Sequence, residues 1–223
     1  MQVIARIRTD FPEKFGIPRQ SGLVPSLRGR IVFEPPYRSP DALRGLEEYS
    51  HLWLIWAFSQ NRDVPWSPTV RPPRLGGNVR VGVFASRSPF RPNPIGLSCV
   101  KLEGISPDGP DGPVLLVSGA DLMDGTPIYD IKPYLPYADC RPEARGGFGE
   151  ARKDHRLQVI CPSELLAQIP GEHRETVLSL LALDPRPSYQ HDPERVYGMA
   201  YAGMDIRFTV DGETLAVTEI RNL

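Results

Sequence analysis

The chain has 223 residues, of which 40% are hydrophobic and 24% charged, and its formal net charge at neutral pH is −1. This composition is typical of a soluble globular protein and excludes a disordered tail or a coiled coil. Proline is abundant, with 25 residues beside 20 glycines, and this disfavours a helical bundle because proline lacks a backbone donor and fixes φ. The longest apolar run, 52–58, is far shorter than the roughly 20 residues that cross a bilayer, so we expect no membrane span.

The cysteines and the N-terminus favour a cytoplasmic protein. Cys99, Cys140 and Cys161 are odd in number and show no CxxC spacing, which indicates reduced thiols. The first ten residues alternate apolar and charged side chains and contain no apolar signal core. The four histidines form no close ligand pair, so we expect no metal site.

Charge is distributed unevenly along the chain. Residues 62–91 contain six arginines and one acid, which gives this segment a local balance of 6 − 1 = +5. Guanidinium groups suit phosphate and carboxylate, because their planar donors match both anions. Seven prolines between 65 and 94 hold the backbone extended. The segment is either an anion-binding loop or a salt-bridged surface loop. Its arginines are Arg62, Arg71, Arg74, Arg80, Arg87 and Arg91.

Hydrophobic patterning predicts a mainly β fold for the first 137 residues. A short helix fits 40–48, with Ser39 as its N-cap and Pro40 at its first position. We expect these elements to form a β-barrel body with long loops, spanning 1–137. The predicted strands are 3–7, 52–58, 79–84, 95–102 and 114–117.

The remainder of the chain predicts a smaller α+β C-terminal extension. Residues 138–154 are rich in charge and glycine and are interpreted as a linker or mobile loop. In 155–223, helical patterns cover 163–169 and 172–183. Apolar alternation on both sides of Asp211-Gly212 predicts a hairpin of 205–210 and 214–220.

Several common signatures are missing. The chain has no P-loop, no dinucleotide-binding glycine motif and no catalytic-serine elbow. Residues 34–37, Glu-Pro-Pro-Tyr, are similar to a loop of Rossmann-type methyltransferases, but no cofactor-binding glycine loop precedes them. A turn explains them better.

Three aspartates lie close together in 121–130. Asp121 and Asp124 flank one turn, and Asp130 shares a strand face with Lys132 by period two. Asp and Gly also suit a tight turn in their own right. The cluster is either a reactive carboxylate site or a turn with a neighbouring ion pair.

These segments resemble the TsaA-like (YaeB) family, the tRNA methyltransferase O group. The 184–189 segment, DPRPSY, matches the C-terminal extension of the longer bacterial form. The matching pieces of the β body are FGIPRQSGL (15–23), LRGLEEYSHLWLIWAF (43–58), SPTVRPPRLGG (67–77), VGVFASRSPFRPNPIGLS (81–98) and DLMDGTPIYDIKPYLPY (121–137).

The resemblance implies a homodimeric β-barrel enzyme that uses S-adenosyl-L-methionine. Its expected reaction is methylation of N6 of N6-threonylcarbamoyladenosine, next to the anticodon of threonine tRNA. Ser59 stands where some relatives carry His, and it reaches less far. The implied cofactor-binding residues are Pro18, Arg19, Gln20, Ser59, Gln60, Arg87, Leu97, Asp121, Leu122, Met123 and Asp124.

The expected chemistry needs a proton acceptor, since the attacking N6 loses a proton as its new bond forms. Asp124 or Asp130 is predicted to be that acceptor. The threonine carboxylate of the target suits a bidentate arginine, for which Arg71, Arg74 and Arg91 are candidates.

Further residues are predicted to contact RNA. Asn93 and Arg186 join the three candidate arginines as RNA-binding residues. Phe90, Tyr134 and Tyr137 are either stacking partners for a flipped base or core residues.

Two other functions stay open at this point. A barrel that grips RNA without catalysis fits the arginine loop, but a phosphate-binding face avoids carboxylates such as those in 121–130. A methyltransferase for small molecules would not need the C-terminal extension. If the extension serves only RNA, deleting 155–223 should leave cofactor binding intact.

Overall fold

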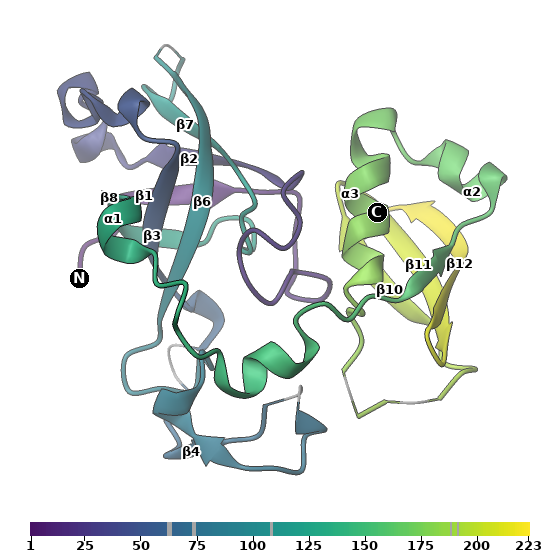
Figure 1. Ribbon diagram of the computed structural model, residues 1–223. Coiled ribbons are helices and arrows are strands. Elements are labelled where there is room, and N and C mark those ends of the chain that lie inside the picture. The colour runs from purple at the N-terminus through teal and green to yellow at the C-terminus, as the bar shows by residue number, and fades with distance from the viewer. Residues whose placement is uncertain (62–63, 73–74, 108, 188, 191) are drawn as a thin grey trace.

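A computed structural model describes residues 1–61, 64–72, 75–107, 109–187, 189–190 and 192–223 (Figure 1). The first part is a closed six-stranded barrel, as predicted. Neighbouring strands are antiparallel and follow the order β1-β2-β7-β6-β3-β8. The strands are β1 (Ala5–Arg8), β2 (Arg28–Phe33), β3 (His51–Ala57), β6 (Ile95–Ser106), β7 (Val114–Ser118) and β8 (Pro127–Pro133).

The barrel core is made of inward-facing aliphatic side chains at alternate strand positions. Ile7, Ile31, Leu52, Leu54 and Leu115 are fully buried there. Their alternation with exposed residues is the period-two pattern of a strand with one buried face.

Two predicted elements in the barrel half are wrong. The predicted strand 79–84 is reduced to β5 (Val81–Gly82), which pairs with β4 (Thr69–Val70) and runs into a 3-10 turn, Val83–Ala85. The predicted helix 40–48 is two 3-10 turns, Pro40–Leu43 and Leu46–Glu48. They are separated by Gly45, whose φ of 85° breaks a helix. The Ser39 side chain makes no capping hydrogen bond.

The C-terminal part is an α+β unit, as predicted. Its sheet has the order β10-β11-β12-β9, and the predicted hairpin is β11 and β12. The elements are β9 (Gln158–Ile160), α2 (Ser163–Gln168), α3 (Gly171–Ala182), β10 (Tyr197–Tyr201), β11 (Met204–Asp211) and β12 (Thr214–Asn222).

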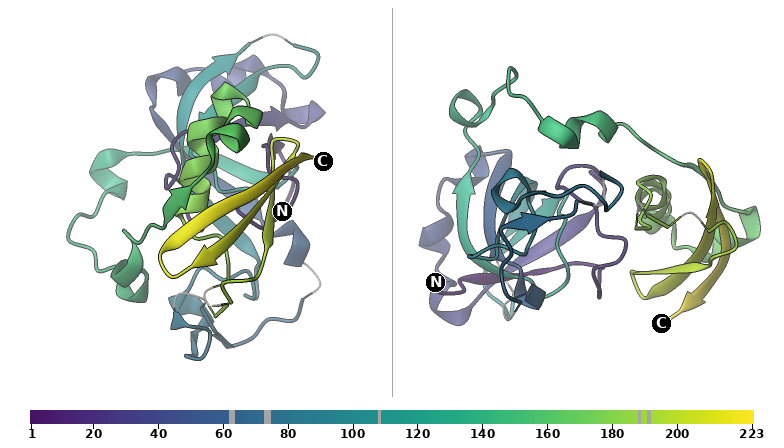
Figure 2. Two further views of the ribbon diagram at one scale, coloured as in Figure 1. Left: turned by 90° about the vertical axis from the view of Figure 1, so that its right-hand side faces the viewer. Right: turned by 90° about the horizontal axis from the view of Figure 1, so that it is seen from below.

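A connecting segment joins the two parts and runs past the outside of the molecule (Figure 2). It contains α1 (Pro136–Asp139) and a 3-10 helix, Gly147–Arg152.

Two further 3-10 turns, Pro35–Tyr37 and Ser59–Asn61, follow β2 and β3. None of the helices in the described part of the chain is long and apolar enough to span a bilayer.

The loop between β1 and β2, residues 9–27, leaves the barrel and reaches the C-terminal unit (Figure 1). Phe11, Val24 and Leu27 of this loop are buried in the same apolar cluster as the inner residues of the C-terminal sheet. The two parts therefore share a core.

Candidate functional site

One end of the barrel carries a cavity of about 500 Å³, a size typical of small-molecule sites. Its walls come from the loop 14–20, the end of β3 with the turn after it, the segment 87–97 and the turn 121–126. Ten residues implied by the family resemblance for the cofactor line it: Pro18, Arg19, Gln20, Ser59, Gln60, Arg87, Leu97, Asp121, Leu122 and Met123.

Asp121 is the only carboxylate among the described residues of the lining. The Ser98 hydroxyl donates a hydrogen bond to Asp121 Oδ1 at 2.6 Å, and Trp56 Nε1 donates to Ser98 Oγ at 3.0 Å. Burial raises the pKa of Asp121, although the Ser98 hydrogen bond and the Arg87 charge oppose this. The carboxylate is thus held in place and made more basic than an exposed aspartate.

The cavity lining is otherwise rich in cations and amides. The Arg87 guanidinium donates to Gln20 Oε1, which ties the segment 87–97 to the loop 14–20 across the cavity. Lys14 Nζ donates to Asn61 Oδ1 at 3.2 Å, which joins the loop 14–20 to the turn after β3. These contacts bring together segments far apart in the sequence.

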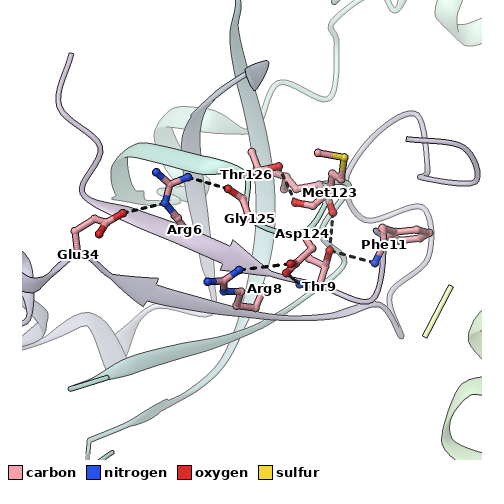
Figure 3. Close-up of polar contacts among 10 residues, drawn as sticks. Arg6, Arg8, Thr9, Phe11, Glu34, Met123, Asp124, Gly125 and Thr126 are labelled. Atoms are coloured by element: carbon pink, nitrogen blue, oxygen red, sulfur yellow. Dashed lines mark hydrogen bonds and ion pairs between the residues drawn. The ribbon is translucent and has the colours of Figure 1, made fainter. Parts of the chain in front are cut away.

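Asp124 is not among the described residues that line the cavity. The family resemblance implied that it binds the cofactor, and it was also predicted as a candidate proton acceptor. Its Oδ1 accepts a hydrogen bond from the Thr9 backbone at 3.1 Å, and its Oδ2 lies 3.5 Å from Arg8 Nη1 (Figure 3). Its own backbone N–H donates to the Phe11 carbonyl at 2.8 Å. Asp124 therefore joins β1 to the turn before β8, and its position does not support a part in proton transfer.

Asp130, the other candidate acceptor, also lies away from the cavity. It is paired with Lys132 at 3.1 Å and accepts a hydrogen bond from the Ile131 backbone at 3.0 Å. The structure therefore shows the ion pair between Asp130 and Lys132 on one strand face, which was one of the two interpretations of the sequence. Glu34 of the Glu-Pro-Pro-Tyr segment likewise pairs with Arg6, at 3.0 Å.

The predicted RNA-binding residues are dispersed. Arg91 and Asn93 line the cavity, Arg71 is exposed beyond it, and Arg74 lies outside the described residues. Arg186 is only 8% exposed, and its Nε donates to Asp184 Oδ1 at 2.9 Å. In the structure this arginine stabilises a turn of the C-terminal unit, and its contact with RNA stays a prediction.

The three aromatic residues predicted to stack on a base do not belong to the described cavity lining. Phe90 is exposed, and Tyr137 is 84% exposed beyond the barrel. The Tyr134 ring packs against the Trp53 ring, with 5.7 Å between centroids. Tyr134 therefore belongs to local packing outside the barrel, and none of the three is among the described lining residues.

Sequence reasoning missed three described residues of the lining, Lys14, Trp56 and Asn61, and also Ser98, which contacts the lining through Asp121 and Trp56. Trp56 and Ser98 lie on neighbouring paired strands, and a hydrogen bond joins Lys14 to Asn61. Trp56 and Ser98 were hidden in apolar runs predicted as strands. Their polar atoms, an indole N–H and a hydroxyl in strands with one buried face, were the available signal.

Family models match almost the whole chain. The N-terminal domain model of tRNA-methyltransferase O matches residues 6–140, and the TrmO C-terminal domain model matches 154–223. The chain belongs to the tRNA methyltransferase O family. Membership confirms the prediction of a tRNA methyltransferase and argues against the non-catalytic barrel.

Several individual members of the family are similar to this chain over most of their length. The tRNA (adenine(37)-N6)-methyltransferase of Escherichia coli is 43% identical over 215 residues, which cover 93% of this chain and 91% of the relative. A Pseudomonas aeruginosa protein, described as a putative S-adenosylmethionine-dependent methyltransferase, is 44% identical over 215 residues, 92% of this chain and 90% of the relative. A crystal structure of TrmO from Pseudomonas aeruginosa has a TM-score of 0.77 and 35% identity, covering 100% of this chain and 99% of that one.

Proposed function

We propose that the cavity binds S-adenosylmethionine and that the chain methylates N6 of adenosine 37 in a tRNA. The named activity of the Escherichia coli relative supports the reaction, as does the same name for a protein of Eikenella corrodens that is 47% identical over 164 residues. We further propose N6-threonylcarbamoyladenosine of threonine tRNA as the substrate, on the family resemblance. The homodimer stays a prediction, which sedimentation velocity tests.

The residues of the cavity fit this cofactor. A sulfonium is cationic, so a carboxylate should face it, and the position of Asp121 meets this need. Leu97, Leu122 and Met123 supply an apolar wall. Gln20 and Gln60 offer amides to the polar nucleoside. The single observation that carries the proposal is the partly buried carboxylate of Asp121 inside a cavity of this composition.

The reaction is an in-line displacement, so most of the acceleration should come from alignment. S-adenosylmethionine supplies the electrophilic methyl group when bound. Asp121 accepts the N6 proton as the nitrogen–methyl bond forms and the sulfur–methyl bond breaks, which leaves a neutral thioether. Its raised pKa suits this task, because a more basic carboxylate takes a proton more readily. Ser98 holds the carboxylate in one orientation.

Arg91 is the candidate best placed to bind the threonine carboxylate, because it lines the cavity. Its Nη1 donates a hydrogen bond to the Ser86 carbonyl at 3.2 Å, which helps to fix the guanidinium group. We expect Arg91→Ala to weaken binding of tRNA that carries threonylcarbamoyladenosine by roughly tenfold more than binding of unmodified tRNA. Arg80 is the matched control, because it lies outside the described lining and bonds Thr69 Oγ1 at 3.1 Å. Arg80→Ala should affect both RNAs alike. Equal losses for Arg91→Ala would assign it to phosphate alone.

The proposed reaction is tested by mass spectrometry of nucleosides. Purified protein is incubated with S-adenosylmethionine and threonine tRNA, either with or without threonylcarbamoyladenosine at position 37. A gain of one methyl group on the modified adenosine supports the whole proposal. Methylation of the unmodified tRNA alone would refute the threonylcarbamoyl substrate, and no methylation of either, with tRNA binding intact, would refute the reaction.

A further inference from the structure

The 9–27 loop has two sides with different partners. One side forms a wall of the cavity and contributes Lys14, Ile17, Pro18, Arg19 and Gln20 to its lining. The other side packs into the core of the C-terminal unit. The same short stretch of backbone therefore separates the cavity from the C-terminal sheet.

Two aromatic residues anchor the loop in the C-terminal core. Phe11 is 1% exposed, and its ring centroid lies 5.1 Å from that of Tyr201 in β10. The Phe15 ring is nearly parallel to that of Tyr197, with 6.5 Å between centroids, and lies 6.4 Å from Phe208. Buried aromatic residues contribute large apolar areas, so these contacts fix where the loop can lie.

Gly16 brings the backbone of the loop directly against the C-terminal unit. Its φ is 89°, and a Cβ at this position would lie 2.5 Å from both Cγ and Sδ of Met199. Met199 is fully buried in β10. The next residue, Ile17, both packs against the C-terminal core and lines the cavity. Met199 therefore lies directly against Gly16, and Gly16 is the neighbour in sequence of Ile17, which lines the cavity.

Polar contacts hold both ends of the loop. At its start, the Ala202 backbone donates to the Asp10 carbonyl at 3.0 Å. Near its end, Thr176 Oγ1 donates to Ser26 Oγ at 2.9 Å, and Thr176 is buried in α3. Burial and the Asp10 carboxylate beside it raise the pKa of Tyr201, so its hydroxyl stays a donor at this junction.

We propose that the C-terminal unit sets the shape of the cofactor cavity by holding the wall 15–20, and that Met199 and Phe15 are positioning residues for the cofactor. This inference rests on the proposed function, in which the cavity binds S-adenosylmethionine. It also changes an expectation drawn from the sequence: deletion of 155–223 would uncover Phe11 and Phe15 and release the wall, and cofactor binding would not survive.

The test uses the full chain with substitutions at Met199. Met199→Ala removes the side chain that supports Gly16, and Met199→Leu keeps its volume. Leu215→Ala is the matched control, because Leu215 is equally buried in the same core but lies in β12, two strands away from β10. Circular dichroism establishes that each variant is folded at the temperature of the assay. Calorimetry then measures S-adenosylmethionine affinity, and hydrogen exchange measures protection of the amides in 15–20.

We expect Met199→Ala to weaken S-adenosylmethionine binding by about tenfold and to speed amide exchange in the wall, because misplaced binding groups lose affinity steeply. Met199→Leu should keep both properties close to those of the parent, and folded Leu215→Ala should keep S-adenosylmethionine affinity within about twofold of the parent. If the folded Met199→Ala variant binds as tightly as the parent with unchanged exchange, the inference is wrong. If the parent itself does not bind S-adenosylmethionine, the proposed function fails, while faster exchange in Met199→Ala alone still supports the mechanical link.

Discussion

Asp121 is a partly buried carboxylate, and its burial opposes ionisation. Burial raises the pKa of Asp121 in the folded chain. Ionising this carboxyl group therefore costs more free energy in the folded chain than in the unfolded chain. The contribution of Asp121 to stability is therefore greatest below the ordinary carboxylate pKa and is lost as pH rises through its raised folded value. Shifted pKa values that cost stability are common for the reactive groups of functional sites.

Asp121→Asn should accordingly separate activity from stability. We expect methylation to fall by about 100-fold or more, since the amide cannot accept the N6 proton. The free energy of unfolding at neutral pH should rise relative to the parent, and the difference should shrink towards acidic pH. Urea titrations at several pH values and single-turnover assays measure the two effects. A variant that keeps its activity would remove Asp121 from the reaction.

Single residues of the site were predictable only where a motif carried them. The resemblance placed Gln20, Arg87 and Asp121 in one cavity, and the structure brings them together. Trp56 and Ser98 were missed because their contact depends on the register between β3 and β6, which apolar patterning does not fix.

At the scale of elements, the turn before β8 is fastened to β1. Arg6 Nη1 donates to the Gly125 carbonyl at 3.2 Å, and Thr9 Oγ1 donates to the Leu122 carbonyl at 3.0 Å (Figure 3). Asp124 completes the junction by accepting from the Thr9 backbone. The junction places Leu122 and Met123 against the cavity, so a residue outside the lining still shapes it.

This arrangement predicts that Asp124 stabilises the fold and takes no part in the chemistry. Asp124→Ala leaves the Thr9 N–H without its acceptor and should lower the free energy of unfolding by about 1–2 kcal/mol. Asp124→Asn keeps an acceptor oxygen and loses only an exposed ion pair with Arg8, so its cost should be about 0.5 kcal/mol or less. Chemical denaturation and single-turnover rates measure both. A large loss of rate in a stable Asp124→Asn variant would restore Asp124 as the proton acceptor.

Elements were predictable where apolar alternation was unbroken. The hairpin of β11 and β12 follows such a pattern and was found, and β3 was found because it is a continuous apolar run. β2 was missed because exposed Arg28 and Arg30, with Gly29 between them, conceal its inward face. The segment 79–84 was predicted as a strand because it is apolar, but Val79 and Phe84 are exposed and do not form a buried strand face.

At the scale of the whole molecule, the chain is less divided than its composition indicates. A charged, glycine-rich segment separates the barrel from the C-terminal unit in the sequence, and this pattern predicts independent parts. Yet Phe11, Val24 and Leu27 complete the C-terminal core from the N-terminal side. Apolar residues scattered in a loop have no periodicity, so sequence patterning could not reveal the shared core.

A shared core predicts that both parts unfold together. The three tryptophans, at 53, 56 and 66, all belong to the N-terminal part, so their fluorescence reports only on that part. Leu215→Ala removes buried volume from the C-terminal sheet and should cost about 2–5 kcal/mol. We expect it to lower the urea midpoint seen by tryptophan fluorescence as much as the midpoint seen by far-ultraviolet circular dichroism, because the loop 9–27 transmits the loss. A fluorescence midpoint that stays at the parent value while the dichroism signal splits would show that the barrel unfolds alone.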